Sequence, residues 1–160
     1  LGYTGTRFKD LYLSGGVFLG GTGAANKLQD YETGTYVATM TATSGSISVS
    51  STYDELSYIK VGNLVTVTGY LSVSSVSSPV GNLFISLPFT SGNSFKYQSA
   101  AGTKFNAISG GSIQDMWAIV FPNEARITTY RAVANSVTSD SAQYMQSNSD
   151  VRISVSYYTP

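Results

Sequence analysis

Nine carboxylates are the side chains of this sequence that could carry out acid–base chemistry, because the chain contains no histidine and no cysteine. Without His and Cys, neither a Ser-His-Asp nor a Cys-His catalytic arrangement can form, and zinc sites with nitrogen and sulfur ligands are excluded. Glycoside hydrolysis needs only two carboxylates. Most of the nine fall at turns or strand ends, where they are usually solvated or cap the backbone. The sequence therefore favours a protein that is not an enzyme and leaves a polysaccharide hydrolase as the less favoured alternative. The nine are Asp10, Asp30, Glu32, Asp54, Glu55, Asp115, Glu124, Asp140 and Asp150.

No group of residues predicts a metal or a cofactor. Asp30 and Glu32 could contact calcium, but hard cations require more oxygen ligands than these two side chains supply. The glycine-rich stretch at residues 20–23 lacks the Lys-Ser/Thr pair and the following helix of a phosphate-binding loop, so it predicts a turn. We expect neither a metal nor a cofactor.

Two polar loops carry aromatic side chains that could contact a ligand. The longer one spans residues 135–149, and a connection of this length in a compact β domain is usually functional or mobile. It combines a tyrosine ring with amide donors and acceptors, which suit the hydroxyls of a saccharide. The alternative is that Tyr144 and Met145 only anchor this loop to the body of the protein or to a neighbouring chain. The second loop spans residues 90–101. The residues predicted to bind are Gln143, Tyr144, Gln146, Asn148, Phe95 and Tyr97.

The elements that position these loops are β-strands, because apolar and polar residues alternate through most of the chain and helical periodicity is almost absent. The alternation is clearest at residues 63–73, 82–90 and 151–158. Residues 115–121 are apolar on both faces and predict a central strand with Trp117 in the core. Weaker strands are predicted at residues 35–43, 47–50, 56–61, 103–108 and 126–133. The spacing of strands and turns predicts an all-β fold, an antiparallel β-sandwich of jelly-roll type.

The order of the strands predicts which loops share an end of the domain. If each strand reverses direction, and residues 47–50 are counted with the returning loop, the loops at residues 44–52, 74–81, 109–111 and 134–149 lie at the end away from the N-terminal segment. The loop at residues 90–101 then lies at the opposite end, which weakens the case for Phe95 and Tyr97.

Residues 1–33 differ from the rest of the sequence and are predicted to form a neck, with residues 34–160 as a globular head. Two short strands, within residues 7–13 and 17–19, are apolar on both faces and therefore need cover on both sides. Identical chains wrapped about a shared axis would supply that cover. The alternative is that the two strands join the sheets of the head. The residues predicted to pack in the neck are Phe8, Leu11, Tyr12, Leu13, Val17, Phe18 and Leu19.

The charge of the chain narrows the choice of partners. Nine basic and nine acidic residues cancel, and the basic ones are scattered, which argues against a nucleic-acid partner. No apolar run is long enough for insertion into a membrane, and no signal peptide is recognisable. A neutral surface rich in Ser and Thr is compatible with saccharide ligands. The sequence starts without Met in the middle of a pattern, so we expect a fragment of a longer chain.

Three stretches carry a family resemblance. Residues 7–36, RFKDLYLSGGVFLGGTGAANKLQDYETGTY, join an Arg–aromatic–Lys-Asp-Leu-Tyr-Leu lead to a Gly-Gly turn and a Leu-x-Asp-Tyr-Glu motif. Residues 58–69 read YIKVGNLVTVTG and residues 82–90 read NLFISLPFT. Together these stretches resemble the C-terminal region of the tail fibre proteins of tailed bacteriophages. Position 36 is Tyr where similar sequences often have Trp followed by a Thr-Pro pair.

The resemblance implies a homotrimer in which an intertwined shaft leads into β-rich heads at the distal end of the fibre, in the virion. Such heads bind the bacterial surface, so the implied partner is a surface polysaccharide or lipopolysaccharide, and the implied role is host adsorption without catalysis. The main alternative is a purely structural head that trimerises or spaces the fibre while another protein recognises the host.

Overall fold

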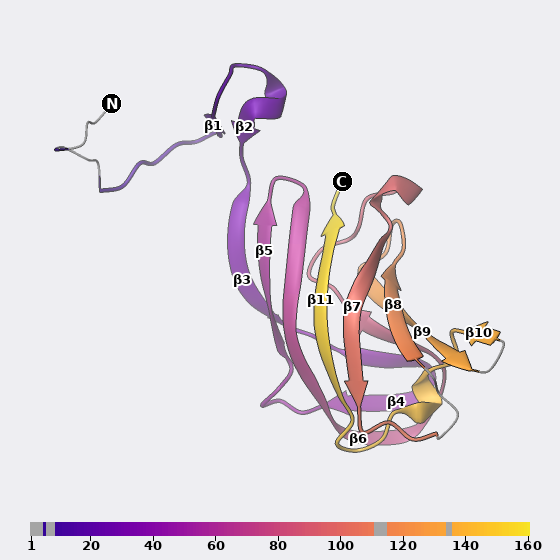
Figure 1. Cartoon of the computed structure of the whole chain (residues 1–160). Helices are drawn as coiled ribbons and strands as arrows, with labels where there is room; N and C mark the ends of the chain where they lie inside the picture. The colour runs from indigo at the N-terminus through magenta and orange to yellow at the C-terminus, as the bar shows by residue number, and fades with distance from the viewer. Residues whose placement is uncertain (1–4, 6–8, 111–114, 134–135) are drawn as a thin grey trace.

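The computed structural model describes residues 5, 9–110, 115–133 and 136–160. The described chain is all-β, as predicted, and most of its strands form one barrel-like sheet (Figure 1). The strands are β1 (Val17–Phe18), β2 (Lys27–Leu28), β3 (Tyr31–Val37), β4 (Met40–Val49), β5 (Glu55–Val61), β6 (Leu64–Ser86), β7 (Ser99–Asn106), β8 (Asp115–Val120), β9 (Arg126–Val133), β10 (Ser136–Thr138) and β11 (Asp150–Tyr158). Three short 3-10 helices accompany them: η1 (Ala24–Asn26), η2 (Phe95–Tyr97) and η3 (Ala142–Tyr144).

The barrel closes because two strands each pair with two different sets of neighbours. The first half of β6 pairs with β5 and β11, and its second half pairs with β4 and, over its last three residues, with β9. Likewise, β7 pairs with β8 at its start and with β11 at its end. With β8 beside β9, the ladder returns to β6, and every pairing is antiparallel. Strands that change partners in this way form the corners of a closed β structure.

The core is built by the period-two alternation of β6 and β11. Apolar side chains of these two neighbouring strands point inward, as predicted, because alternate residues of a strand face the same side. The largest of them, Tyr157, is 1% exposed, and its hydroxyl donates a hydrogen bond of 3.0 Å to the Phe89 carbonyl. Burial raises the pKa of Tyr157 to about 12. The buried residues of the two strands include Val65, Val67, Leu71, Val73, Val151, Ile153, Val155 and Tyr157.

The strand β8 lies between β7 and β9, which confirms the prediction of a central strand. Met116, Ala118 and Val120 are buried, whereas Trp117 is only half-buried. The Trp117 ring stacks on Tyr130 of β9, with ring centroids 6.4 Å apart and planes inclined by 16°. The prediction of Trp117 in the core was wrong because a stacked aromatic pair on the outer face gives the same apolar pattern as a fully covered strand.

Two predicted loops are instead parts of strands. Residues 44–49 belong to β4 and residues 74–81 to β6, and the two strands pair along this stretch through several register shifts. Ser is the commonest residue in both segments, and residues 74–81 show no apolar alternation. The two segments are held together by backbone hydrogen bonds, which the pattern of side chains does not reveal. β6 is therefore one strand of 23 residues rather than two strands and a loop.

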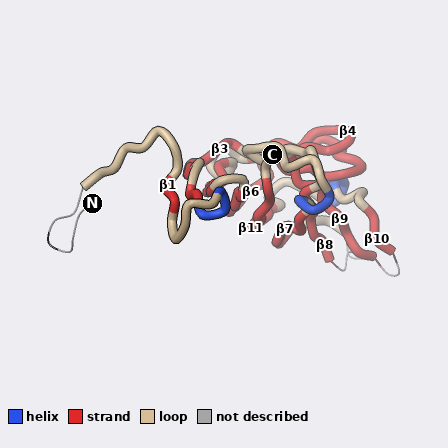
Figure 2. The backbone as a smooth tube through the Cα atoms, turned by 90° about the horizontal axis from the view of Figure 1, so that it is seen from above, coloured by secondary structure: helices blue, strands red, loops and turns tan. Residues whose placement is uncertain are grey.

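The N-terminal segment projects from one end of the barrel (Figure 2). β1 pairs with β2, but residues 9–13 form no strand, so the strand predicted within residues 7–13 is wrong for its described part. A short strand without a partner is not stable alone. Phe8 lies outside the described residues. The other residues predicted for the neck are exposed: Leu11, Tyr12, Leu13, Val17, Phe18 and Leu19.

The predicted boundary between residues 33 and 34 falls inside β3, whose Tyr31, Glu32 and Thr33 pair with β5. The trimer, the jelly roll and the sandwich stay predictions. Among the described residues, no helix is long and apolar enough to cross a membrane.

Candidate functional site

The segment at residues 136–149 lies at the end of the barrel away from the N-terminal hairpin (Figure 1). It is more ordered than a long loop, because it contains β10, which pairs with β9, and the 3-10 helix η3. Its end is fixed to β6 by backbone hydrogen bonds between Val73 and the pair Asn148 and Ser149. The Ser109 amide donates to the Tyr144 carbonyl, which ties the segment to the stretch after β7 as well.

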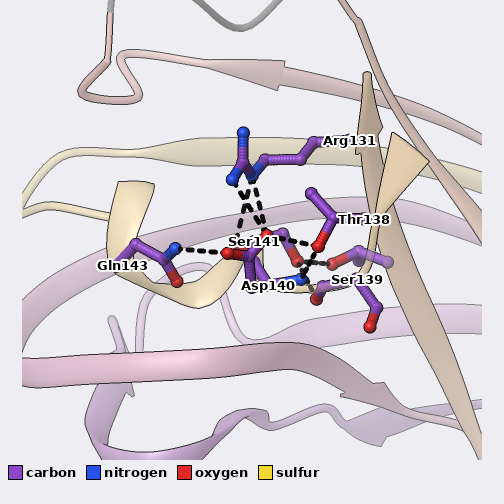
Figure 3. Close-up of polar contacts among 7 residues, drawn as sticks. Arg131, Thr138, Ser139, Asp140, Ser141 and Gln143 are labelled. Atoms are coloured by element: carbon purple, nitrogen blue, oxygen red, sulfur yellow. Dashed lines mark hydrogen bonds and ion pairs between the residues drawn. The ribbon is translucent and has the colours of Figure 1, made fainter. Parts of the chain in front are cut away.

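An ion pair between Arg131 and Asp140 organises the segment (Figure 3). The Arg131 guanidinium of β9 lies 2.9 Å from the Asp140 carboxylate and also donates to the Asp140 carbonyl at 3.1 Å. The Thr138 hydroxyl donates to the same carboxylate at 2.6 Å, and the Gln143 amide donates to its other oxygen at 3.2 Å. The Arg131 side chain is only 10% exposed, so this charge is held within the structure and paired.

The Asp140 carboxylate is stabilised in its charged form. The hydrogen bond from Thr138, followed by the contacts with Gln143 and Arg131, holds the pKa of Asp140 below its usual range, although partial burial opposes this. A glycosidase acid requires the opposite, a raised pKa that keeps the proton at neutral pH. The geometry of Asp140 therefore suits a structural anion that orders the segment.

The four residues predicted in this segment have different environments. Tyr144 is half-buried, with the Arg131 guanidinium 4.6 Å from its ring centroid, so its ring serves to anchor the segment. Gln143 is half-buried and donates to Asp140, and its buried amide oxygen has no hydrogen-bond partner among the described residues. Gln146 and Asn148 are exposed. The four residues thus share one segment, and the two exposed ones can contact a ligand, although the Gln146 amide already donates to the Ala107 carbonyl.

Phe95 and Tyr97 lie far from this segment, in η2 at the end of the barrel from which the N-terminal hairpin projects (Figure 1). Phe95 is 79% exposed. The two predicted loops therefore do not form one site.

Comparison with known proteins gives one informative match. No protein-family model matches the sequence, and no curated protein is significantly similar to it. The chain is similar to part of a phage tailspike. A crystal structure of the Dettilon tailspike protein (gp208) superposes with a TM-score of 0.65 at 25% sequence identity. The match covers 80% of this chain but only 24% of the tailspike, so the chain spans about a quarter of that protein's length. The similarity supports a phage tail protein.

The carboxylates of the described residues are mostly paired rather than gathered. Asp30 bonds Lys60, Glu32 accepts from the Tyr58 hydroxyl, and Glu124 pairs with Arg126. No group of three or more acidic side chains within metal-binding reach occurs in the described part of the chain.

Sequence reasoning missed the residues that hold the segment in place. Arg131, Thr138 and Asp140 make its main polar contacts, yet only Asp140 had been considered, as a turn residue. The available signal was an arginine inside a strand whose only other charged residue, Arg126, is its first, followed nine residues later by an aspartate in a polar segment. An arginine placed in this way predicts a buried ion pair.

Proposed function

We propose that this chain is a receptor-binding domain of a phage tail fibre or tailspike, and that it binds a bacterial surface glycan without cutting it. The similarity to the tailspike structure supports the phage tail assignment. The observation that carries the binding proposal is the 136–149 segment. Its backbone is fixed by the Arg131–Asp140 pair, while Gln146 and Asn148 remain exposed. A fixed backbone lowers the entropy lost on binding.

In this proposal the chain acts as a homotrimer in the virion, at the distal end of the fibre. Weak single sites then gain strength from several copies on one particle, because each bound copy raises the effective concentration of the next. The ligand is a polysaccharide or lipopolysaccharide of the host surface.

A structural head is the second candidate, and the exposed apolar side chains of the N-terminal segment favour it. Tyr12 is 91% exposed and Leu11 66% exposed, which indicates a surface that another chain covers. The receptor-binding domain and the structural head both require this contact between chains, so the two candidates are distinguished by whether the protein adsorbs to bacteria.

The test is adsorption of the labelled protein to a panel of bacterial strains. Asn148 has a φ of 70°, so Asn148→Gly keeps a backbone that glycine adopts readily and removes only the amide side chain. The matched control is Asn123→Gly, because Asn123 is also exposed, has a φ of 60° and lies in the turn between β8 and β9.

On a strain that the wild type binds, we expect Asn148→Gly to weaken adsorption about five- to thirtyfold, the effect of losing contacts worth about 1–2 kcal/mol. Asn123→Gly should bind like the wild type. If no strain is bound, the structural candidate is favoured, and release of reducing sugars from a bound strain would favour the hydrolase.

A further inference from the structure

The outer face of the barrel next to the 136–149 segment carries a row of three cross-strand neighbours. Lys104 of β7 lies directly opposite Arg152 of β11 in the strand register, and Arg152 lies opposite Tyr70 of β6. Directly paired residues of neighbouring strands project from the same face of a sheet. Lys104 is exposed, and the Arg152 side chain is 57% exposed. This row lies close to the segment, because Asp150, at the start of β11, directly follows it.

The charges of the row are not balanced. The Arg152 guanidinium forms an ion pair with the Asp150 carboxylate at 2.8 Å. The same carboxylate accepts a hydrogen bond of 2.7 Å from the Asn106 amide. Lys104 has neither an ion pair nor a hydrogen-bond partner in the described part of the chain. Two cations directly opposite each other on a sheet repel one another. Glu55 of β5 precedes Leu56, which pairs with Gly69, so its carboxylate continues the row on the far side of Tyr70. An anion is therefore favoured at the β7–β11 side, where Lys104 and Arg152 lie opposite each other.

Aromatic rings extend the row. The Arg152 guanidinium lies 5.1 Å from the centroid of the Tyr70 ring, and the Tyr53 ring packs edge-on against Tyr70 with centroids 5.5 Å apart. Tyr53 is 51% exposed. A tyrosine ring held in this way offers an apolar face and a polar hydroxyl to one ligand, at a low entropic cost.

Hydroxyl groups form the next row of the same face. Ser154 of β11 pairs with Gly102 on one side and with Thr68 on the other, and Thr68 pairs with Ser57 of β5. These three hydroxyls have no hydrogen-bond partner among the described residues. Gly102 has no side chain, and a shallow depression of about 330 Å³ lies there between Lys104 and Arg152. The row crosses four strands, which is about 14 Å at the usual strand spacing.

We propose that this face binds an anionic polysaccharide. The acidic group of the polysaccharide lies against Lys104 and Arg152. The sugar hydroxyls form hydrogen bonds with Ser154 and Thr68, and an apolar face of a sugar ring contacts Tyr53. Charge complementarity selects an acidic glycan over a neutral one. This inference rests on the proposed function in that the ligand is a surface glycan, and it adds the charge of that glycan and a second contact surface.

The test is affinity electrophoresis of the full chain in gels that contain polygalacturonate or neutral dextran. We expect polygalacturonate to retard the wild type more than dextran does. Lys104→Gln should weaken this binding about fivefold, as for one exposed ion pair. Tyr53→Ala should weaken it without any change of charge. Lys96→Gln, on the exposed part of η2, removes the same charge elsewhere and should have no effect.

Three outcomes would overturn the inference: equal retardation by the two polymers, an equal loss in Lys96→Gln, or a change of oligomeric state in Lys104→Gln, which would make the face a subunit contact. Adsorption of the same variants to bacteria distinguishes a failure of this inference from a failure of the proposed function. If the wild type adsorbs and Lys104→Gln adsorbs equally well, only the inference fails. If the wild type adsorbs to no strain, the proposed function fails.

Discussion

Single residues fix the 136–149 segment more than any regular element does. The Asp140 carboxylate accepts from Thr138, Gln143 and Arg131, and the Arg131 guanidinium covers the Tyr144 ring. Because most of these contacts converge on one carboxylate, they order the backbone before η3 and within it. The exposed Gln146 then follows directly, and its amide donates to the Ala107 carbonyl at 2.8 Å. Order in the proposed binding surface thus comes from the polar contacts of Asp140 and Arg131.

Ionisation of Tyr157 lowers the free energy of unfolding at alkaline pH. Its pKa is raised to about 12, from 10 in the unfolded chain, mainly by burial. The neutral phenol is therefore favoured in the folded state. The resulting stabilisation is fully present below pH 10 and is lost as the pH rises towards 12. Burial also raises the pKa of Tyr36, which adds to the same loss.

The expected result for Tyr157→Phe is a free energy of unfolding lower by about 1 kcal/mol at neutral pH, because the hydrogen bond to the Phe89 carbonyl is lost. The variant should also lose less stability than the wild type as the pH rises above 10. Urea unfolding at several pH values between 7 and about 11.5 measures both effects. Tyr12→Phe, on the exposed N-terminal segment, is the control and should match the wild type. An unchanged alkaline slope in Tyr157→Phe would contradict the assignment.

At the scale of elements, the β4–β6 ladder depends on a close backbone approach. Gly45 has a φ of 76°, and a Cβ atom there would lie 2.2 Å from the Ser78 carbonyl oxygen. Gly62, in the β5–β6 turn, has a φ of 57° but no atom within 4 Å of a Cβ. Both glycines therefore have a left-handed backbone that would strain an alanine, but only Gly45 lacks the space for a Cβ atom.

Gly62→Ala should cost about 1 kcal/mol of stability, from the left-handed backbone alone. Gly45→Ala should cost about 3 kcal/mol or more, because the backbone of β6 must move as well. Thermal and urea unfolding of both variants measures the difference. Equal costs would mean that β4 and β6 are not as close at Gly45 as the structure places them.

The same ladder marks the limit of what the sequence could predict. Strands with a buried face, such as β11 with Val151, Ile153 and Val155, were predicted because burial imposes the alternation. Residues 74–81 were taken for a loop because their side chains are mostly exposed, and only the backbone records the pairing. The position of the candidate site followed from strand order. The Arg131–Asp140 pair did not follow from strand order, because an ion pair between a strand and the segment after it adds nothing to the apolar alternation.

At the scale of the whole molecule, the barrel buries its apolar side chains whereas the N-terminal segment exposes them. The buried core lies entirely within residues 38–157, and β3 begins its pairing with β5 at Tyr31. Residues 9–30, in contrast, contribute no buried side chain and expose several large apolar ones. The barrel therefore has its own core, and in the proposed homotrimer the apolar residues of the segment are covered by the other chains.

Removal of residues 1–30 should consequently leave a folded barrel that no longer trimerises. We expect the fragment 31–160 to keep the β-sheet circular dichroism spectrum and cooperative unfolding of a single domain. Light scattering should give a monomer for this fragment and a trimer for the full chain. Phe18→Ser with Leu19→Ser in the full chain is the finer test, because it changes two exposed side chains near β1 and leaves the barrel intact. If the fragment remains trimeric, the subunit contact lies on the barrel itself. The exposed Ile59 and Val61 of β5 and Leu64 of β6 are then the surface to change next.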